Sequence, residues 1–149
     1  MLSMGPGWYE DPYLKTLGPL GDGPISFVPW MDPKKELTPV VVEAFNAKYP
    51  DSAINTNQIF TFEALQIAAD VAQRASGTDP DALVEALKAT DITNNISIGP
   101  GVKFDEKGQN QWLGNAAIQN TDGKTPVVAP ADAADGEPVY PMPPYNERG

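Results

Sequence analysis

The residues capable of chemistry in this sequence are carboxylates, lysines and tyrosines, because the 149-residue chain has no histidine and no cysteine. Without cysteine there is no disulfide, thiolate nucleophile or zinc-thiolate site. Without histidine, the usual metal ligand and the usual general base near neutral pH are both absent. The composition therefore excludes Ser-His-Asp and Cys-His catalysis, and we expect no catalytic residue, no metal and no cofactor.

Two pairs of neighbouring acids, Glu10-Asp11 and Asp105-Glu106, are the remaining candidates for acid–base or metal chemistry. Neighbouring side chains point in different directions on a regular strand or helix, so each pair is most simply a capping or solvated pair. Asp105 and Asn110 superficially resemble a calcium loop, but Lys107 and Gly108 do not fit the twelve-residue pattern. A hydrolase would need two acids about 5 to 10 Å apart in a cleft, and the sequence offers no convincing pair.

Three side chains suit the non-covalent recognition of a ligand. Trp8 and Tyr9 follow a Gly-Pro-Gly loop and could stack on a ligand at the end of a sheet, where clefts in open α/β folds lie. They could equally cover the nearby core. Asn57 stands just before a long helix, where it could hydrogen-bond at a cleft or serve only as a cap.

The charge and hydropathy of the chain limit the kinds of partner that it can bind. There are 20 acids against 10 bases, and the net charge of -10 repels phosphate backbones and anionic membrane surfaces, so we expect no nucleic-acid partner. No apolar run approaches the roughly 20 residues of a membrane helix. Residues 1–10 have neither the basic start nor the apolar segment of a secretory signal, which predicts a soluble chain.

The longest predicted helix covers residues 59–75 and has apolar residues on more than one face. A helix with so wide an apolar arc is expected to be buried, with only a narrow polar edge that includes Glu63 and Asp70. Ser76-Gly77 is expected to end it with a left-handed glycine cap. The two apolar rows consist of Phe60, Ala64, Ile67, Val71 and Ala75, and of Leu65, Ala68 and Ala72.

Shorter elements surround this helix in a pattern typical of an α/β fold. A strand is expected before Gly5, and further short strands are expected at residues 25–28, 102–104, 112–118 and 126–129. Helices are expected at residues 11–17, 38–49 and 80–89, because each has a cap residue and a proline in its first turn. Residues 29–33 contain two prolines and are interpreted as a crossing or hinge.

The order of these signals resembles the type I periplasmic substrate-binding proteins of ABC transporters, in particular the branched-chain amino acid group that includes Leu/Ile/Val-binding proteins. The resemblance covers nearly the whole chain, but it corresponds only to the C-terminal part of such a protein. It rests on Met4-Gly5-Pro6 at a strand end, the crossing after Val28, Thr61 to Gln66 opening a long helix, Asp79-Pro80, Phe104 to Gln109 and a terminal Asp122-Gly123-Lys124 hairpin.

This resemblance implies a partial type I periplasmic binding protein fold, with two Rossmann-like lobes joined by a hinge and the N-terminal portion absent. Residues 1–28 would belong to lobe two, 29–117 to lobe one, and 118–149 to the hinge return and a tail on lobe two. Such proteins bind a ligand between the lobes, close by hinge motion and present the closed form to a membrane permease. They are not enzymes, and they are periplasmic or extracellular.

The resemblance also implies ligand-facing residues, namely Gly7, Trp8, Tyr9 and Asn57. Gly7 falls where amino-acid binders have a glutamate that receives the ligand ammonium group. Without that carboxylate, an α-amino acid becomes a doubtful ligand, because a buried ammonium needs a paired charge. Trp8 and Tyr9 would then favour an aromatic or less polar acid. Ligand contacts from the first lobe would come mostly from residues that the chain does not contain.

The wide apolar arc of residues 59–75 takes on another meaning under this resemblance. It fits a lobe-one sheet whose strands come mostly from elsewhere. We therefore expect the chain to pair with the missing N-terminal part of the same protein, or to form a homo-oligomer through exposed apolar surface. The alternative is a free-standing ligand-sensing or protein-interaction domain that reuses the same fold.

Overall fold

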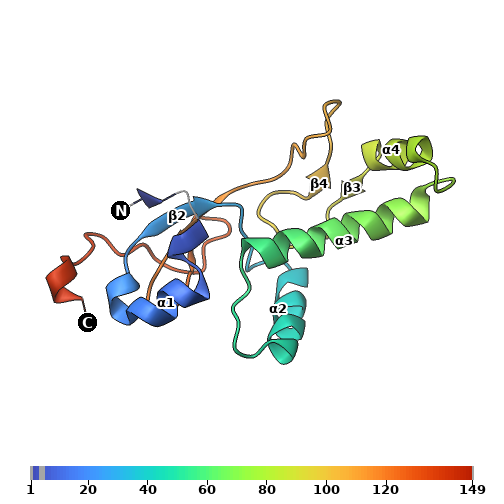
Figure 1. Cartoon of the computed structure of the whole chain (residues 1–149). Helices are drawn as coiled ribbons and strands as arrows, with labels where there is room; N and C mark the ends of the chain where they lie inside the picture. The colour runs from blue at the N-terminus through green and yellow to red at the C-terminus, as the bar shows by residue number, and fades with distance from the viewer. Residues whose placement is uncertain (1, 4–5, 149) are drawn as a thin grey trace.

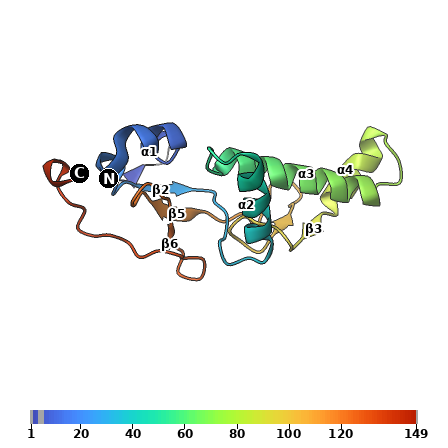
Figure 2. The same ribbon diagram turned by 90° about the horizontal axis from the view of Figure 1, so that it is seen from below.

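The structure is a computed structural model that describes residues 2–3 and 6–148. Figures 1 and 2 show an elongated molecule with two parts, which we call the sheet end and the helical end. The sheet end consists of β1 (Leu2–Ser3), η1 (Pro6–Trp8), α1 (Asp11–Leu17), η2 (Gly18–Gly21), β2 (Ile25–Val28), β5 (Ala116–Gln119), β6 (Val127–Ala129) and η3 (Tyr145–Glu147). The helical end consists of α2 (Leu37–Lys48), α3 (Thr56–Arg74), α4 (Pro80–Lys88), β3 (Asp91–Ile92) and β4 (Val102–Lys103).

The sheet end is built on a four-stranded sheet with the order β1-β2-β5-β6. β1 pairs with β2 in parallel, whereas β2–β5 and β5–β6 are antiparallel. Ile25 lies opposite Gln119 and Val28 lies opposite Ala116, so β2 and β5 are neighbours although they are far apart in sequence. The helical end is therefore inserted between two adjacent strands of one sheet.

Two chain segments connect the ends, and a third lies between them. We call residues 95–99 the strap. Its Ile98 N–H donates to the carbonyl of Trp30 at 2.9 Å, and its Ile96 carbonyl accepts from Asp32 N–H at 2.7 Å. On the other side, Gly114 N–H donates to the Ile98 carbonyl at 2.8 Å. The strap thus joins the outgoing and returning segments, and the predicted crossing, residues 29–33, lies in the outgoing segment.

The core lies where the two ends meet. A cluster of buried residues from both ends fills this region, and α3 contributes to it only through its first turns, with Ile59 fully buried and Phe62 packed against the cluster. The buried members are Tyr9, Val28, Trp30, Ile59, Ile96, Ile98, Ala116, Ile118, Val127 and Ala133.

The prediction that the helix at residues 59–75 is buried on more than one face is wrong for this chain. Leu65 is 67% exposed and Phe60 is 40% exposed, and Ala68 and Ala72 are also exposed. The core contacts only the first turns of α3, and α4 packs beside the last turns of α3. No element of the described chain therefore covers the face of α3 that carries Phe60 and Leu65. The expected left-handed cap at Gly77 is also absent, because the helix ends at an extended Ala75 with φ −65° and ψ 138°.

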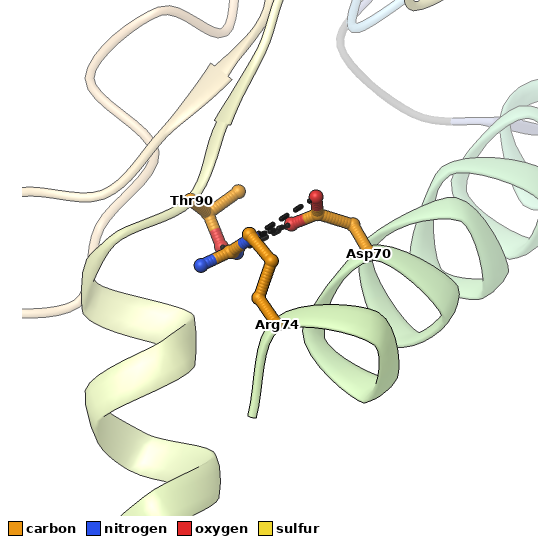
Figure 3. Close-up of polar contacts among 3 residues, drawn as sticks. All are labelled: Asp70, Arg74 and Thr90. Atoms are coloured by element: carbon orange, nitrogen blue, oxygen red, sulfur yellow. Dashed lines mark hydrogen bonds and ion pairs between the residues drawn. The ribbon is translucent and has the colours of Figure 1, made fainter. Parts of the chain in front are cut away.

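The last turns of α3 are joined to the start of β3 by a polar contact (Figure 3). The Arg74 guanidinium donates from Nε to both carboxylate oxygens of Asp70, at 3.1 and 3.0 Å, and from Nη2 to the buried Thr90 hydroxyl at 3.2 Å. The hydrogen bond from Arg74 holds the pKa of Asp70 below its usual value. The same bond raises the pKa of Arg74. This contact fixes α3 relative to α4 and β3.

Candidate ligand site at the junction of the two ends

The predicted ligand-facing residues of the sheet end follow β1, and they differ in exposure. Gly7 and Trp8 lie in η1, where Gly7 is exposed and Trp8 is half-buried. The Trp8 ring packs edge-on against Tyr13 with a centroid distance of 5.3 Å. The Trp8 carbonyl accepts a hydrogen bond from the side-chain amide of Asn120. η1 is therefore anchored to both α1 and the turn after β5.

Tyr9 is 5% exposed, so its ring belongs to the core in this conformation. It packs edge-on against Trp30 with a centroid distance of 5.3 Å. Its hydroxyl lies 3.1 Å from the Thr56 hydroxyl, and Thr56 also donates to the Pro29 carbonyl at 3.3 Å. The structure thus brings a predicted site residue of the sheet end to the N-terminus of α3.

Asn57 lies in the first turn of α3 with an exposed side chain. Its backbone N–H donates to the side chain of Asn55 at 2.9 Å, and the Gln58 side chain accepts from Asn55 N–H at 3.0 Å. This capping box satisfies backbone donors that would otherwise be free at the helix N-terminus. A ligand at this end of α3 would therefore meet side chains, chiefly Asn57, more than free N–H groups.

Thr56 is a junction residue that the sequence reasoning missed. It is the first residue of α3 and bridges Tyr9 and Pro29 from there. The available sequence signal was only its place as a polar residue at the predicted start of the long helix, where backbone and side-chain donors and acceptors need partners.

A second polar centre lies beside the junction and was also missed. Glu63 is 5% exposed, and one of its carboxylate oxygens accepts from Ser97 N–H at 2.9 Å and from the Asn95 amide at 3.0 Å. The Lys35 ammonium donates to the Asn95 side chain and to the carbonyls of Ser97 and Gly99, at 2.6 and 2.7 Å respectively. Lys35, from the segment before α2, and Glu63, from α3, together hold the strap.

Burial lowers the pKa of the Lys35 ammonium, because a charged group loses water there. The negative charges of Asp32 and Glu63 oppose this shift and favour the charged form. Lys35 makes its hydrogen bonds to groups of the strap, so the network joins the segment before α2 to the strap and, through Asn95, to α3. It lies where the chain crosses between the ends.

One acid of each pair makes structural hydrogen bonds. Asp11 accepts from Lys15 and from Ala53 N–H. Asp105 accepts from the backbone N–H groups of Lys107 and Gln109, at 2.8 and 2.9 Å, and so closes a turn. Among residues 2–3 and 6–148, no group of three acidic side chains is arranged to hold a metal ion.

Comparison with known proteins places the chain in a family. The family described as "Periplasmic binding protein" matches residues 1–135. The chain belongs to the periplasmic binding protein family. The fold is accordingly a partial α/β type I fold, as the sequence indicated. Met4 and Gly5, which contribute to the resemblance, lie outside the described residues.

Two relatives show how much of a periplasmic binding protein this chain contains. It is 30% identical over 97 residues to Leu/Ile/Val-binding protein homolog 7 of Brucella suis biovar 1 (strain 1330), which is 64% of this chain and 24% of that protein. It is 32% identical over 94 residues to Leu/Ile/Val-binding protein homolog 8 of Brucella abortus (strain 2308), which is 62% of this chain and 23% of that protein. The matched region thus spans about a quarter of each relative.

Within the described part of this periplasmic binding protein, no helix has both the length and the apolar character needed to cross a membrane.

Proposed function

We propose that this chain is part of the solute-binding component of an ABC transporter and that it binds an amino acid or a related small organic acid between two lobes. The main support is the junction itself. Tyr9 from the sheet end and Thr56 from the helical end meet at 3.1 Å, next to Trp8 and Asn57. The relatives are named as Leu/Ile/Val-binding protein homologues, which supports a small organic ligand.

The lobes that we propose follow the two ends of the molecule. Residues 1–28 and the C-terminal segment from about residue 118 form part of lobe two, and residues 29–117 form part of lobe one. The insertion of the helical end between β2 and β5 supports this division. β5 already begins at Ala116, so the change of lobe falls at the start of that strand.

The ligand that we propose has an aromatic or aliphatic body and a carboxylate. Gly7 has no side chain to pair with an ammonium group, whereas Trp8 offers a half-buried ring nearby. The chain has no histidine or cysteine, which suits a binding protein without catalysis. By its family, we place it in the periplasm or outside the cell, working with a membrane permease.

The Trp8→Ala substitution tests this assignment. Calorimetry is carried out with leucine, phenylalanine and phenylacetate on the complete gene product that contains this chain, and at least one of these ligands is expected to bind. Trp8→Ala is expected to weaken that affinity about tenfold or more, because an aromatic anchor in a site is commonly an energetic hot spot. Trp112→Ala is the matched control, because Trp112 is also half-buried but lies next to Lys103 at the helical end. If both variants and the wild type bind with equal affinity, Trp8 is not part of the ligand site.

The exposed face of α3 leads to a proposal about partners. We propose that Leu65 and Phe60 pack against the missing N-terminal part of the same protein or, in the isolated chain, against a second copy. The isolated chain is then expected to gain mass with concentration in light scattering, and Leu65→Lys is expected to shift it towards a monomer. Val40→Lys is the matched control, because Val40 is a comparably exposed aliphatic residue, at 60%, on α2. A monodisperse wild-type monomer with a cooperative melt would contradict this proposal.

A further inference from the structure

The last residues of the chain are attached to the sheet end by specific contacts. We call residues 137–148 the tail, and both views show its η3 at the end of the molecule opposite to α4 (Figures 1 and 2). The Gln119 side chain accepts from Val139 N–H at 2.8 Å and donates to the Val139 carbonyl at 3.1 Å. The Arg148 guanidinium donates from Nη1 to the Asp22 carbonyl at 3.0 Å. The tail is thus held against the sheet end, although the family match ends at residue 135.

A pocket lies between the tail and the sheet end. Its volume is about 210 Å³, which is below the roughly 300–1,000 Å³ of pockets for drug-sized ligands. Its wall includes three apolar residues, namely Pro19 from η2 and Val139 and Pro143 from the tail. The four predicted ligand-facing residues, all of which the structure describes, are not among the residues that line it. The pocket therefore suits a molecule of a few heavy atoms and differs from the candidate ligand site.

Two residues that line this pocket each have a buried acceptor oxygen with no donor in the described part of the chain. The first is Asn120, which is 1% exposed. Its amide nitrogen donates to the carbonyls of Trp8 and Gly21, which fixes its orientation and leaves Oδ1 unpartnered. The second is Asp22, whose Oδ2 accepts from Asp122 N–H at 3.1 Å while Oδ1 accepts from no described group. Because buried oxygens are normally paired, they point to a donor supplied by a molecule in the pocket.

The charges around the pocket favour a cationic donor. Two acids, Asp22 and Glu147, line it, and neither makes an ion pair with another described residue. Arg148 is the one base among the described residues of the wall, and it donates to the carbonyls of Pro143 and Asp22, at 2.8 and 3.0 Å, so it holds the tail in place. The net charge of -10 adds to the attraction for cations. A donor with a positive charge also makes a stronger hydrogen bond to a carboxylate than a neutral donor.

We propose that this pocket binds a small organic ammonium ion with a short apolar body. The ammonium group donates to Oδ1 of Asp22 and Oδ1 of Asn120, which it can do at once because it carries three donors. The apolar body packs against Pro19, Val139 and Pro143. The tail supplies part of the wall, so residues beyond the family match complete this second site. The inference does not rest on the proposed function, because it uses neither Trp8 nor the junction of the two ends.

Ligand-detected NMR titrations on the complete gene product that contains this chain test the site. The probes are n-butylammonium chloride and 1-butanol, a neutral molecule of the same length, and sodium chloride keeps the ionic strength constant. Butylammonium is expected to bind about tenfold more tightly than butanol. Asp22→Asn is expected to abolish this difference, because it removes the charge and keeps an oxygen for Asp122 N–H. Asp132→Asn is the matched control, because Asp132 is an exposed acid of the sheet end outside the pocket, and it is expected to leave the difference unchanged.

Three outcomes overturn the ammonium site. If butylammonium shows no saturable binding, water is enough to satisfy the two oxygens. If the unchanged protein binds butylammonium and butanol equally, the pocket does not recognise charge, and this comparison needs no variant to fold. If Asp22→Asn and Asp132→Asn weaken butylammonium binding equally, the ion responds only to net charge. Circular dichroism checks that both variants are folded. The proposed function is tested with other ligands and with Trp8→Ala, so either proposal can fail while the other stands.

Discussion

Glu63→Ala is expected to lower the free energy of unfolding by about 3–5 kcal/mol, because it breaks a buried polar network at the centre of the molecule. The lost carboxylate leaves Ser97 N–H without its acceptor and takes one acceptor from the Asn95 amide, and both residues are buried. It also removes one of the two negative charges, those of Asp32 and Glu63, that favour the charged form of Lys35. For a domain of ordinary stability, about 5–15 kcal/mol, this is a large share.

Urea denaturation followed by tryptophan fluorescence measures this effect, since Trp30 lies in the same core. Glu63→Gln is expected to cost less than Glu63→Ala, because the amide oxygen still accepts one hydrogen bond although the charge is lost. Glu43→Ala is the control, because Glu43 is an exposed residue of α2 and its loss is expected to change stability by no more than about 0.5 kcal/mol. Equal stability of Glu63→Ala and Glu43→Ala would show that the network contributes nothing.

The elements that were predicted well from the sequence are those with local start and stop signals. The helix at residues 11–17 and the strand at residues 25–28 are confirmed as α1 and β2. α4 begins at the predicted proline and is capped by Asp79, whose carboxylate accepts from Ala82 N–H at 3.0 Å. Caps and prolines act within a few residues, so they can be identified without knowledge of the fold.

The burial of α3 was predicted poorly, because burial depends on what packs against a helix. Glu63 was assigned to the polar edge on account of its charge, yet it lies in the row Ile59, Glu63, Ile67, four residues from a fully buried isoleucine. That spacing was the available signal. Leu65 shows the opposite error, because an apolar side chain was expected to be covered and no described element covers it.

The sequence singled out segments that lie together in the structure, and whether they form a ligand site stays a prediction. Gly7, Trp8, Tyr9 and Asn57 come from two segments that the fold brings to one junction, while their role in ligand binding remains a prediction. What the sequence could not show is that the Tyr9 hydroxyl meets Thr56 and that the Lys35 ammonium reaches the strap. Both contacts join residues far apart in sequence, so they follow from the tertiary structure alone.

Gly99→Ala is expected to be strongly disruptive, because Gly99 meets two requirements that only glycine satisfies. Its φ is +108°, which a residue with a Cβ rarely adopts. A Cβ at this position would also lie 2.0 Å from the carbonyl oxygen of Trp112 and 3.0 Å from the backbone nitrogen of Gly114, so the returning segment would have to move. That movement would break the bond of 2.8 Å between Gly114 N–H and the Ile98 carbonyl.

The expected cost of Gly99→Ala is therefore the conformational strain of roughly 1–2 kcal/mol plus the loss of the strap's contact with residue 114. We expect a total above about 3 kcal/mol, with hydrogen exchange of the Ile98 and Gly114 amides rising far more than that of β5. Gly108→Ala isolates the first contribution, because Gly108 has a φ of +77° and nothing within 4 Å of an added Cβ. If both alanine variants lost the same small amount of stability, backbone strain alone would explain the effect, and the strap would not need its close approach to the returning segment.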